Sequence, residues 1–310
     1  MENGRAAVSP VRAIEVSSLR KAYRDVVAAD DVSFAVEHGE IFGIIGPNGS
    51  GKTTTVECLQ GLRTPDSGAI NILGLDPRTQ RNALRHRIGS QLQESSLPDR
   101  IRVWESLDLF AAMSPRSRDW ESLARDWGLY EKRHSAFADL SGGQRQRLFI
   151  ALALVNQPDL VFLDEMTTGL DPAARHDAWG LIRDVREKGA TVVLVTHFME
   201  EAEALCDRVA VFQRGRVLAA DTVQGLVARY AGASTVSFTH DGDLPWLPDV
   251  PGVADISRDG ARFAIRGTGA VLAHVAAALV AHGIAPEDLR VERGTLEDVF
   301  LNLSGPGHVR

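Results

Sequence analysis

The sequence predicts an α/β fold in which helices cover a mostly parallel sheet, followed by a small α+β domain. Apolar runs typical of strands alternate with helix-like segments as far as about residue 230, which is the pattern of a parallel sheet with crossover helices. A glycine-rich stretch at residues 46–54 stands between a strand candidate and a helix candidate. Beyond residue 232 short strand candidates are separated by turns. We therefore predict a tail at residues 1–13, a core domain at residues 14–231 and an accessory domain at residues 232–310.

The composition is that of an ordinary globular protein. The chain has 310 residues, with 44% hydrophobic and 24% charged residues, enough for one large domain or two smaller ones. Its formal net charge of −7 disfavours a nucleic acid held by a basic surface. The first 13 residues contain no apolar core, and no apolar run has the length of a membrane-spanning helix, so we expect neither a signal peptide nor a membrane span. Cys58 and Cys206 lack C-x-x-C spacing, and we interpret them as small buried hydrophobic residues in a reducing compartment.

Strands of the core domain are predicted where apolar or β-branched residues dominate short segments. Residues 32–36 alternate in polarity, as a half-buried strand does, whereas residues 191–196 are apolar or β-branched throughout, as in a strand buried on both faces. The strand candidates of this domain are residues 14–19, 32–36, 41–45, 69–73, 88–93, 159–165, 191–196, 209–212 and 216–219.

Helices are predicted from apolar spacing and from their start and stop signals. From residue 103 to about residue 130 the pattern is amphipathic and is interrupted at Pro115, so we expect a helical insertion at about residues 94–139. The other helix candidates of the core domain are residues 55–59, 81–87, 147–155, 172–187 and 200–206. For the accessory domain we predict strands at residues 236–238, 254–256, 262–265 and 289–292 and helices at residues 271–281 and 295–303.

The glycine-rich stretch matches the phosphate-binding pattern G-x-x-x-x-G-K-[ST]. Its glycines allow the backbone to fold around an anion, and the helix that follows adds its positive N-terminal end. Lys52 would reach the β- and γ-phosphates of a nucleoside triphosphate, and the hydroxyl of Thr53 would bind Mg²⁺. A glycine-rich turn that binds nothing is the alternative, but the strand before and the helix after favour binding. The predicted nucleotide contacts are Gly46, Asn48, Gly49, Ser50, Gly51, Lys52, Thr53 and Thr54.

Three polar residues follow the ends of predicted buried strands. Asp164 and Glu165 close the apolar run at residues 159–165, and His197 follows the run at residues 191–196. Next to a phosphate-binding loop, Asp164 would hold the Mg²⁺ shell, and Glu165 would act as the general base for the attacking water. A solvated carboxylate pair and a packing histidine are the alternatives. We favour the functional interpretation because parallel strands deliver their ends to one edge of a sheet.

A second anion-binding surface is predicted at residues 141–144. Ser141 and Gln144 have the S-x-x-Q spacing of a capping box, which many helices use. Because Gly142 and Gly143 have no side chains, they would also leave the backbone N–H groups accessible at a helix N-terminus, where anions bind. A second phosphate surface is useful to a dimer whose two sites are shared between the copies.

In these motifs the chain resembles the ATP-binding subunits of ABC transporters. Residues 140–144 spell the signature LSGGQ, residues 46–53 match Walker A, and residues 160–165 match Walker B with its catalytic glutamate. Residues 169–171 match the D-loop, His197 the switch histidine and Gln93 the Q-loop glutamine, with Gln91 close by. Tyr23 matches the aromatic residue that stacks on adenine. The matches follow the family's order from about residue 14 to residue 230.

The resemblance implies a specific fold and mechanism. It implies an ABC-type phosphate-loop ATPase core, with an antiparallel β part and the helical insertion. Two copies would close head to tail on two ATP and Mg²⁺, so that Ser141, Gly142, Gly143, Gln144 and Asp171 join the nucleotide contacts. The metal would be held through Thr53, Gln93 and Asp164, with Gln93 linking it to the insertion.

The resemblance also implies a partner and a place in the cell. Residues 94–104 would contact a separate polytopic membrane subunit, which places the protein at the cytoplasmic face of the membrane, and no nucleic-acid partner is expected. Met166 stands where the family has proline, which we expect to loosen the turn without removing a catalytic group.

The end of the chain narrows the function that the resemblance implies. Residues 294–300 resemble the ending of daunorubicin-resistance ATPases, so we expect export of a drug, an antibiotic or a lipid-like substrate. Thr295 and Asp298 also form a capping-box pattern, so a well-capped terminal helix is the plainer interpretation. The alternative function is that of a soluble ABC protein on ribosomes or nucleic acid, against which the single cassette and the acidic charge argue. A dead nucleotide site conflicts with the intact Glu165.

Overall fold

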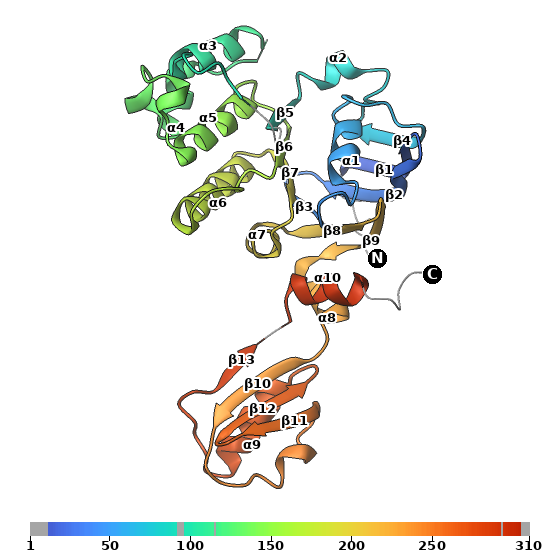
Figure 1. Ribbon diagram of the computed structural model, residues 1–310, viewed down its shortest axis with the longest axis vertical. Coiled ribbons are helices and arrows are strands. Elements are labelled where there is room, and N and C mark those ends of the chain that lie inside the picture. The colour runs from blue at the N-terminus through green and yellow to red at the C-terminus, as the bar shows by residue number, and fades with distance from the viewer. Residues whose placement is uncertain (1–11, 92–95, 115, 293, 305–310) are drawn as a thin grey trace, which may run out of the picture. The chain divides into compact units, whose positions relative to one another are not determined.

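The computed structural model describes residues 12–91, 96–114, 116–292 and 294–304 of the chain. It divides into two compact units, one as far as Val223 and one from Gln224 onward. Helix α8 (Val223–Tyr230), which was not predicted from the sequence, begins at this division. Figure 1 labels the elements of both units, which are described separately below.

The centre of the first unit is a six-stranded sheet in the order β5-β6-β7-β3-β8-β9. The first five strands run parallel and β9 pairs antiparallel with β8, which confirms the predicted mostly parallel sheet. Every residue of β3, β6 and β7 is buried, as expected for parallel strands covered on both faces. The strands are β3 (Ile41–Ile45), β5 (Ile88–Gln91), β6 (Leu160–Asp164), β7 (Thr191–Thr196), β8 (Arg208–Gln213) and β9 (Arg216–Thr222).

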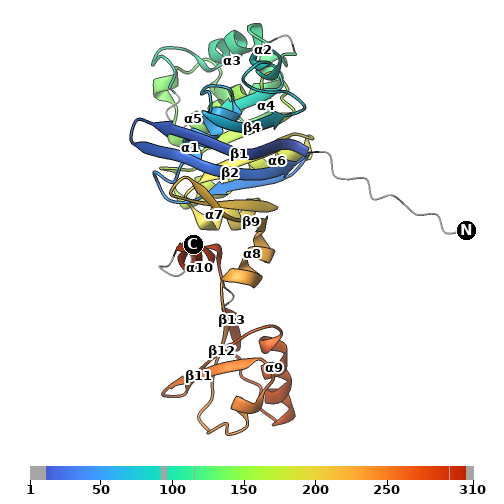
Figure 2. The same ribbon diagram turned by 90° about the vertical axis from the view of Figure 1, so that its right-hand side faces the viewer.

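An antiparallel sheet of three strands packs against the parallel one. Its order is β2-β1-β4, with β1 (Arg12–Tyr23), β2 (Val26–Glu37) and β4 (Ser67–Ile72). The long strands β1 and β2 lie side by side in Figure 2. The core of the unit combines side chains of both sheets with those of α1 (Lys52–Leu59), and Phe34 on β2 stacks on Phe42 on β3 with centroids 5.4 Å apart.

Six further helices complete the first unit. In the insertion, α3 packs on α4 and α5, while α5, α6 and α7 pack on β5, β7 and β3. The predicted interruption at Pro115 falls on a residue outside the described part of the chain, between the end of α3 and the start of α4. The helices are α2 (Arg81–Leu84), α3 (Val103–Ala112), α4 (Trp120–Asp126), α5 (Gly142–Leu154), α6 (Pro172–Glu187) and α7 (Met199–Leu205).

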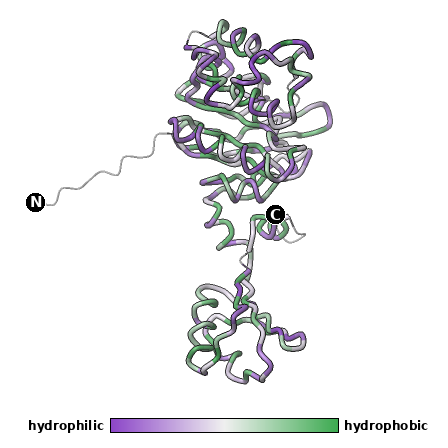
Figure 3. The backbone as a smooth tube through the Cα atoms, turned by 90° about the vertical axis from the view of Figure 1, so that its left-hand side faces the viewer, coloured by the Kyte–Doolittle hydropathy of each residue, from purple (hydrophilic) through white to green (hydrophobic). Residues whose placement is uncertain are grey.

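The second unit has its own antiparallel sheet and core. The strand order is β11-β12-β10-β13, and α9 contributes Val271, Val275 and Leu279 to the core beside the sheet. Apolar and polar stretches alternate along the tube in Figure 3, in keeping with elements that bury one face. The elements are β10 (Ser234–Thr239), β11 (Val253–Asp259), β12 (Arg262–Gly267), α9 (Val271–Ala281), β13 (Arg290–Glu292) and α10 (Leu296–Ser304).

The start of α10 shows the predicted capping interaction. The backbone N–H of Thr295 donates to Asp298 Oδ2 at 2.9 Å, and the N–H of Asp298 donates to Thr295 Oγ1 at 3.2 Å. This reciprocal pair satisfies two of the N–H groups that every helix start leaves without an intrahelical partner. The capping-box interpretation of this sequence is therefore confirmed.

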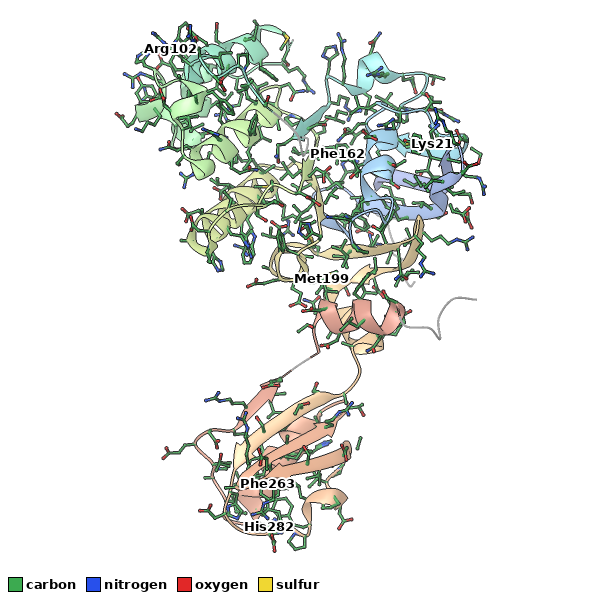
Figure 4. The ribbon with its side chains drawn as sticks, viewed as in Figure 1. Lys21, Arg102, Phe162, Met199, Phe263 and His282 are labelled. Carbon is green, nitrogen blue, oxygen red and sulfur yellow. The ribbon has the colours of Figure 1, made fainter. Side chains whose placement is uncertain are left out.

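Truncating the centre of the main core should strongly destabilise the first unit. Phe162 on β6, labelled in Figure 4, is fully buried among side chains of both sheets. We expect Phe162→Ala to lower the free energy of unfolding by about 3–5 kcal/mol, because it loses buried apolar area and leaves a cavity. Denaturant titration followed by near-UV circular dichroism measures the loss. The control Leu109→Ala, at a side chain 50% exposed on α3, should change it by less than about 0.5 kcal/mol. Equal effects of the two substitutions would contradict this placement of the core.

Candidate nucleotide-binding site

The loop between β3 and α1 is shaped by two glycines that no other residue can replace without strain. Gly46 has φ of 151°, and a Cβ atom there would lie 2.3 Å from the carbonyl oxygen of Phe212. Gly51 has φ of 99°, and its Cβ would lie 2.1 Å from the carbonyl oxygen of Ala28. The loop backbone therefore lies directly against β8 and β2 at these two positions, where only glycine leaves enough room.

Lys52, the first residue of α1, is 5% exposed. Its Nζ donates to the carbonyl oxygens of Gly46 and Pro47 at 2.8 and 3.0 Å. Burial lowers the pKa of Lys52, and the charges of Glu165 and Asp164 oppose that change. An ammonium group that is partly stripped of water gains more from an anionic ligand than a hydrated one does. The position and environment of Lys52 therefore suit a phosphate group.

A pocket of about 650 Å³ opens above this loop. It gathers one side chain from β1, a short stretch of β2, the loop with the start of α1, one carboxylate and one arginine. Tyr23 thus lines the same pocket as the loop, and the cations of Lys21 and Arg63 lie 5.5 and 5.4 Å from the centroid of its ring. The lining residues are Tyr23, Val26, Val27, Ala28, Asn48, Gly49, Ser50, Gly51, Lys52, Thr53, Thr54, Glu165 and Arg214.

Four of these lining residues were not identified from the sequence. Val26 is 65% exposed although it lies in a strand, and Val27, Ala28 and Arg214 also line the pocket. Exposed valines beside the predicted adenine-stacking tyrosine were the available signal for the first two. Arg214 lies in the turn between β8 and β9, and this turn meets the loop because Gly215 N donates to the carbonyl oxygen of Ser50 at 2.9 Å. That long-range hydrogen bond has no signature in the sequence.

The acidic pair and the histidine lie at one edge of the parallel sheet. The register pairs Ile45 with Thr196 and Asp164 with Val195, so β3, β6 and β7 end together. Glu165 has φ of 48°, and its backbone N–H donates to the carbonyl oxygen of Val195 at 2.9 Å. His197 Nδ1 lies 3.1 Å from Glu165 Oε1. The strand ends therefore bring together Glu165, which was predicted as the general base, and His197, which was predicted as the switch histidine.

The surroundings of Asp164 suit a divalent cation. Asp164 is 4% exposed, and burial, followed by the charge of Glu165, raises the pKa of its carboxyl group to about 6, against the opposing charge of Lys52. Among the described residues, Asp164 Oδ1 has no hydrogen-bond partner, although this atom is buried. Carboxylate oxygens are ligands that Mg²⁺ prefers. The carboxylate of Asp164 therefore fits the metal predicted from the sequence.

Residues 141–144 begin α5, away from this pocket. Gln144 N donates to Ser141 Oγ at 3.3 Å, and Ser141 N donates to Gln144 Oε1 at 3.1 Å, so the capping box is formed. A Cβ at Gly142 or at Gly143 would meet its first neighbouring atom only at 4.0 or 3.9 Å. The glycines are thus not required by packing within the chain. This helix start borders a separate pocket of about 270 Å³, lined by Gly128, Ser141, Gly143, Gln144, Gln146, Arg147, Leu170, Ala174, Asp177, Ala178 and Leu181.

The remaining residues that were singled out from the sequence are Asp171 of the D-loop pattern and the glutamines Gln93 and Gln91 of the Q-loop pattern. Asp171 is the N-cap of α6, where its side chain accepts from Ala174 N at 3.0 Å, and it does not line the pocket above the loop. Gln93 lies outside the described residues. The nearby Gln91 ends β5, is 6% exposed, and accepts from Gln146 Nε2 at 3.4 Å.

Met166, the departure from the family pattern, is buried, with 1% of its surface exposed. Proline disfavours helical conformations at the residue before it and restricts that residue to an extended backbone. The φ of 48° at Glu165 falls outside that extended range. Methionine at position 166 is therefore compatible with the left-handed backbone that directs Glu165 toward His197.

The sequence and the structure match known proteins. The ABC transporter family model matches residues 29–168. The Nod factor export ATP-binding protein I of Bradyrhizobium diazoefficiens is 38% identical over 94% of this chain and 96% of its own length. The daunorubicin resistance ATP-binding protein DrrA3 of Streptomyces coeruleorubidus is 36% identical over the same shares.

Solved structures agree with these matches. A structure of an ATP-binding subunit of an ABC transporter has a TM-score of 0.63 and 31% identity, covering 70% of this chain and 93% of that one. A dimeric ATP-binding cassette in a post-hydrolysis state, bound to ADP and phosphate, has a TM-score of 0.62 and 25% identity, covering 67% and 98%. Because the relatives match over nearly their whole length, the chain belongs to the ABC transporter family as an ATP-binding subunit that hydrolyses ATP.

Proposed function

We propose that the chain is the motor of an exporter, in which two copies close head to tail on two ATP molecules at the cytoplasmic face of a membrane. A separate polytopic membrane subunit would carry the substrate, a drug, an antibiotic or a lipid-like molecule. The names of the two relatives, one for Nod factor export and one for daunorubicin resistance, support export. None of the helices in the described part of the chain is long and apolar enough to span a bilayer.

One observation carries the proposal of a shared site. The phosphate-binding loop and the LSGGQ helix start border two different pockets of the same chain. Among the described residues, a Cβ at Gly142 or at Gly143 would make only ordinary van der Waals contacts, with Leu170 and Ala174 respectively, so packing does not require glycine there. A helix N-terminus with bare backbone attracts anions, and a symmetric dimer can bring this surface of one copy to the nucleotide of the other. The dimeric cassette among the solved structures supports this arrangement.

In the proposed site each residue near the phosphates has a distinct role. Lys52 and the backbone N–H groups of the loop bind phosphate oxygens, and Tyr23 stacks on the adenine. Thr53 and Asp164, together with Gln93, would hold Mg²⁺ in the proposed scheme. A bound Mg²⁺ would supply positive charge that offsets the negative charge of the phosphates. Asp171 contributes from the D-loop, besides capping α6.

The proposed chemistry depends on the contact between Glu165 and His197. The carboxylate of Glu165 accepts a proton from the water that attacks the γ-phosphorus, and this general-base role requires a fixed orientation. The 3.1 Å contact from His197 Nδ1 to Glu165 Oε1 supplies that orientation and leaves Nε2 directed elsewhere for a phosphate oxygen. The side chain of Glu165 is 8% exposed, so water around it is restricted.

The alternative of a soluble ABC protein on ribosomes or nucleic acid is not supported. Both relatives are named as export or resistance proteins and match this chain over nearly its whole length. The net charge of −7 also disfavours a polyanionic partner.

Removing the general base should stop turnover without preventing ATP binding. Glu165→Gln keeps the shape of the side chain but cannot accept the proton, so we expect kcat for ATP hydrolysis to fall by about 100-fold or more. Dissociation constants for ATP, measured by fluorescence titration, should stay within about threefold of wild type. Lys52→Ala is the comparison, because it should weaken ATP binding itself. Normal turnover by Glu165→Gln would rule out the role proposed for this residue.

Two inactive chains should restore activity when they are mixed, if the site is shared. Lys52→Ala damages the loop, and Gly143→Glu places negative charge on the signature surface, where an acidic residue at a helix start is compatible with folding. Each homodimer then lacks both intact sites, whereas a mixed dimer keeps one. A one-to-one mixture should recover roughly a quarter of wild-type hydrolysis, since half of the dimers are mixed and each has one site of two. If each chain works alone, the mixture stays inactive.

In the nucleotide-free and metal-free protein, ionisation of Asp164 should lower the free energy of unfolding by an amount that depends on pH. Burial raises its pKa to about 6 in the folded chain, above the unfolded value, so ionisation destabilises the folded state and the penalty is complete above pH 6. We expect Asp164→Asn to raise the free energy of unfolding by about 2–3 kcal/mol at pH 8, and this gain to fade as the pH falls toward 4. Urea titrations across this pH range measure it. A gain that is the same at every pH would contradict the stated cause.

A further inference from the structure

A buried carboxylate lies beside the catalytic edge and has no part in the mechanism above. Glu201 belongs to α7, whose first residue, Met199, is labelled in Figure 4, and it is 0% exposed. Helix α7 packs on α6, β7 and β3, the elements that carry or flank the nucleotide site. A carboxylate at such a position requires donors, because the desolvation of an unpaired charge is very unfavourable.

The donors come from three different segments. Thr167 follows β6, Thr196 ends β7, and Trp179 lies on α6. Burial raises the pKa of Glu201, and hydrogen bonding from Thr196, Thr167 and Trp179, in that order, opposes the rise, followed by the charge of Arg175. The carboxylate is therefore surrounded by groups that stabilise its charged form.

Glu201 Oε1 and Oε2, Thr167 Oγ1 and Trp179 Nε1 are all buried, and among the described residues none of these atoms has a hydrogen bond of regular geometry, either to one another or to another group. Donor and acceptor atoms that are buried without a regular partner thus lie on elements that pack together, since α7 contacts α6 and β7. Thr196 Oγ1 already accepts from the backbone N–H of Phe198 at 3.0 Å, which leaves its own proton to donate. An ionised carboxylate only accepts, whereas a threonine hydroxyl and an indole N–H can donate. We infer that the three donors converge on Glu201.

Two of the three donors, Thr167 and Thr196, lie close in the sequence to residues of the proposed chemistry. Thr167 lies in the turn that follows Glu165, where Thr168 N donates to the carbonyl oxygen of Glu165 at 3.2 Å. Thr196 directly precedes His197. The side chain of Glu201 thus joins the backbone segments on both sides of the Glu165–His197 contact.

We propose that Glu201 is a positioning residue for ATP hydrolysis, which holds the Glu165 turn and the His197 turn in register through Thr167 and Thr196. This inference rests on the roles proposed above for Glu165 and His197. Packing alone would not call for a carboxylate here, because a buried ion pair or charge is often no more stabilising than a well-packed apolar side chain. What a carboxylate can add is a fixed arrangement of its neighbours, since its two oxygens can accept hydrogen bonds from several donors at once.

The test compares the same substitution at two glutamates of α7. Glu201→Gln keeps the size of the side chain but turns one acceptor oxygen into a donor that faces other donors. We expect kcat for ATP hydrolysis to fall by about 10- to 100-fold, because small displacements of catalytic groups are costly, while KM for ATP stays within about twofold. The thermal midpoint should not fall, because a buried charge has been removed. Glu203→Gln, at an exposed position on the same helix, should leave all three quantities unchanged.

A kcat for Glu201→Gln within about twofold of wild type would overturn the proposal, as would a loss of kcat that parallels a loss of thermal stability. If Glu201→Gln does not fold, Thr167→Val tests the same proposal, because it removes one hydrogen-bond donor and keeps the shape of the side chain. A lower kcat at constant KM for Thr167→Val supports the proposal, and an unchanged kcat refutes it. Glu165→Gln in the same assay distinguishes a failure of the role proposed for Glu165 from a failure of the role proposed for Glu201. If Glu165→Gln hydrolyses ATP normally, the catalytic role of Glu165 is refuted. If Glu165→Gln is inactive while Glu201→Gln is active, only the positioning role of Glu201 is refuted.

Discussion

The structure depends on one constraint, the parallel register that ends β3, β6 and β7 at the same edge of the sheet. Ile45 pairs with Thr196, and Asp164 pairs with Val195. These three strand ends are followed by the phosphate-binding loop, the acidic pair and His197. The register of the strands alone therefore brings together residues that are far apart in the sequence. Because all three strands are fully buried, a shift of register would expose or overpack apolar side chains, and the geometry of the site is stabilised by the core itself.

The register of these strands positions only one half of the proposed nucleotide site. In the proposed scheme the edge of the sheet supplies phosphate, metal and water contacts, while the LSGGQ segment begins a helix that borders another pocket. Ser141 and Gln144 form the capping box at the start of this helix, and packing among the described residues does not require the two glycines. A site divided in this way would make ATP part of an interface, so that hydrolysis would change the association of two chains rather than the shape of one.

Much of this was predictable because local signals and tertiary packing agree. The bounds of α6 follow from Asp171 as cap and Pro172 as first residue, and those of α9 follow from its apolar spacing. The phosphate-binding loop was recognised because both of its constrained glycines belong to a local pattern. The pairing of His197 with Glu165 rested on the expectation that parallel strands end together.

The remainder depends on contacts that the sequence does not encode locally. Strands β1 and β2 are longer than predicted because polar residues on an exposed face continue the pairing. Glu200, Glu201 and Glu203 look like one solvated helix face, and only the packing of α7 on its neighbours buries the middle residue. Arg214 joins the pocket through a turn brought in by a distant strand.

Sedimentation velocity can show whether ATP completes a site made of two chains. For Glu165→Gln, which should bind ATP without hydrolysing it, we expect a monomer without nucleotide and a dimer with ATP and Mg²⁺. Adding Gly143→Glu to that variant should return the protein to a monomer while ATP remains bound to the loop. A nucleotide-loaded monomer of the single variant, or a dimer that Gly143→Glu does not disturb, would show that the site is not shared between two chains.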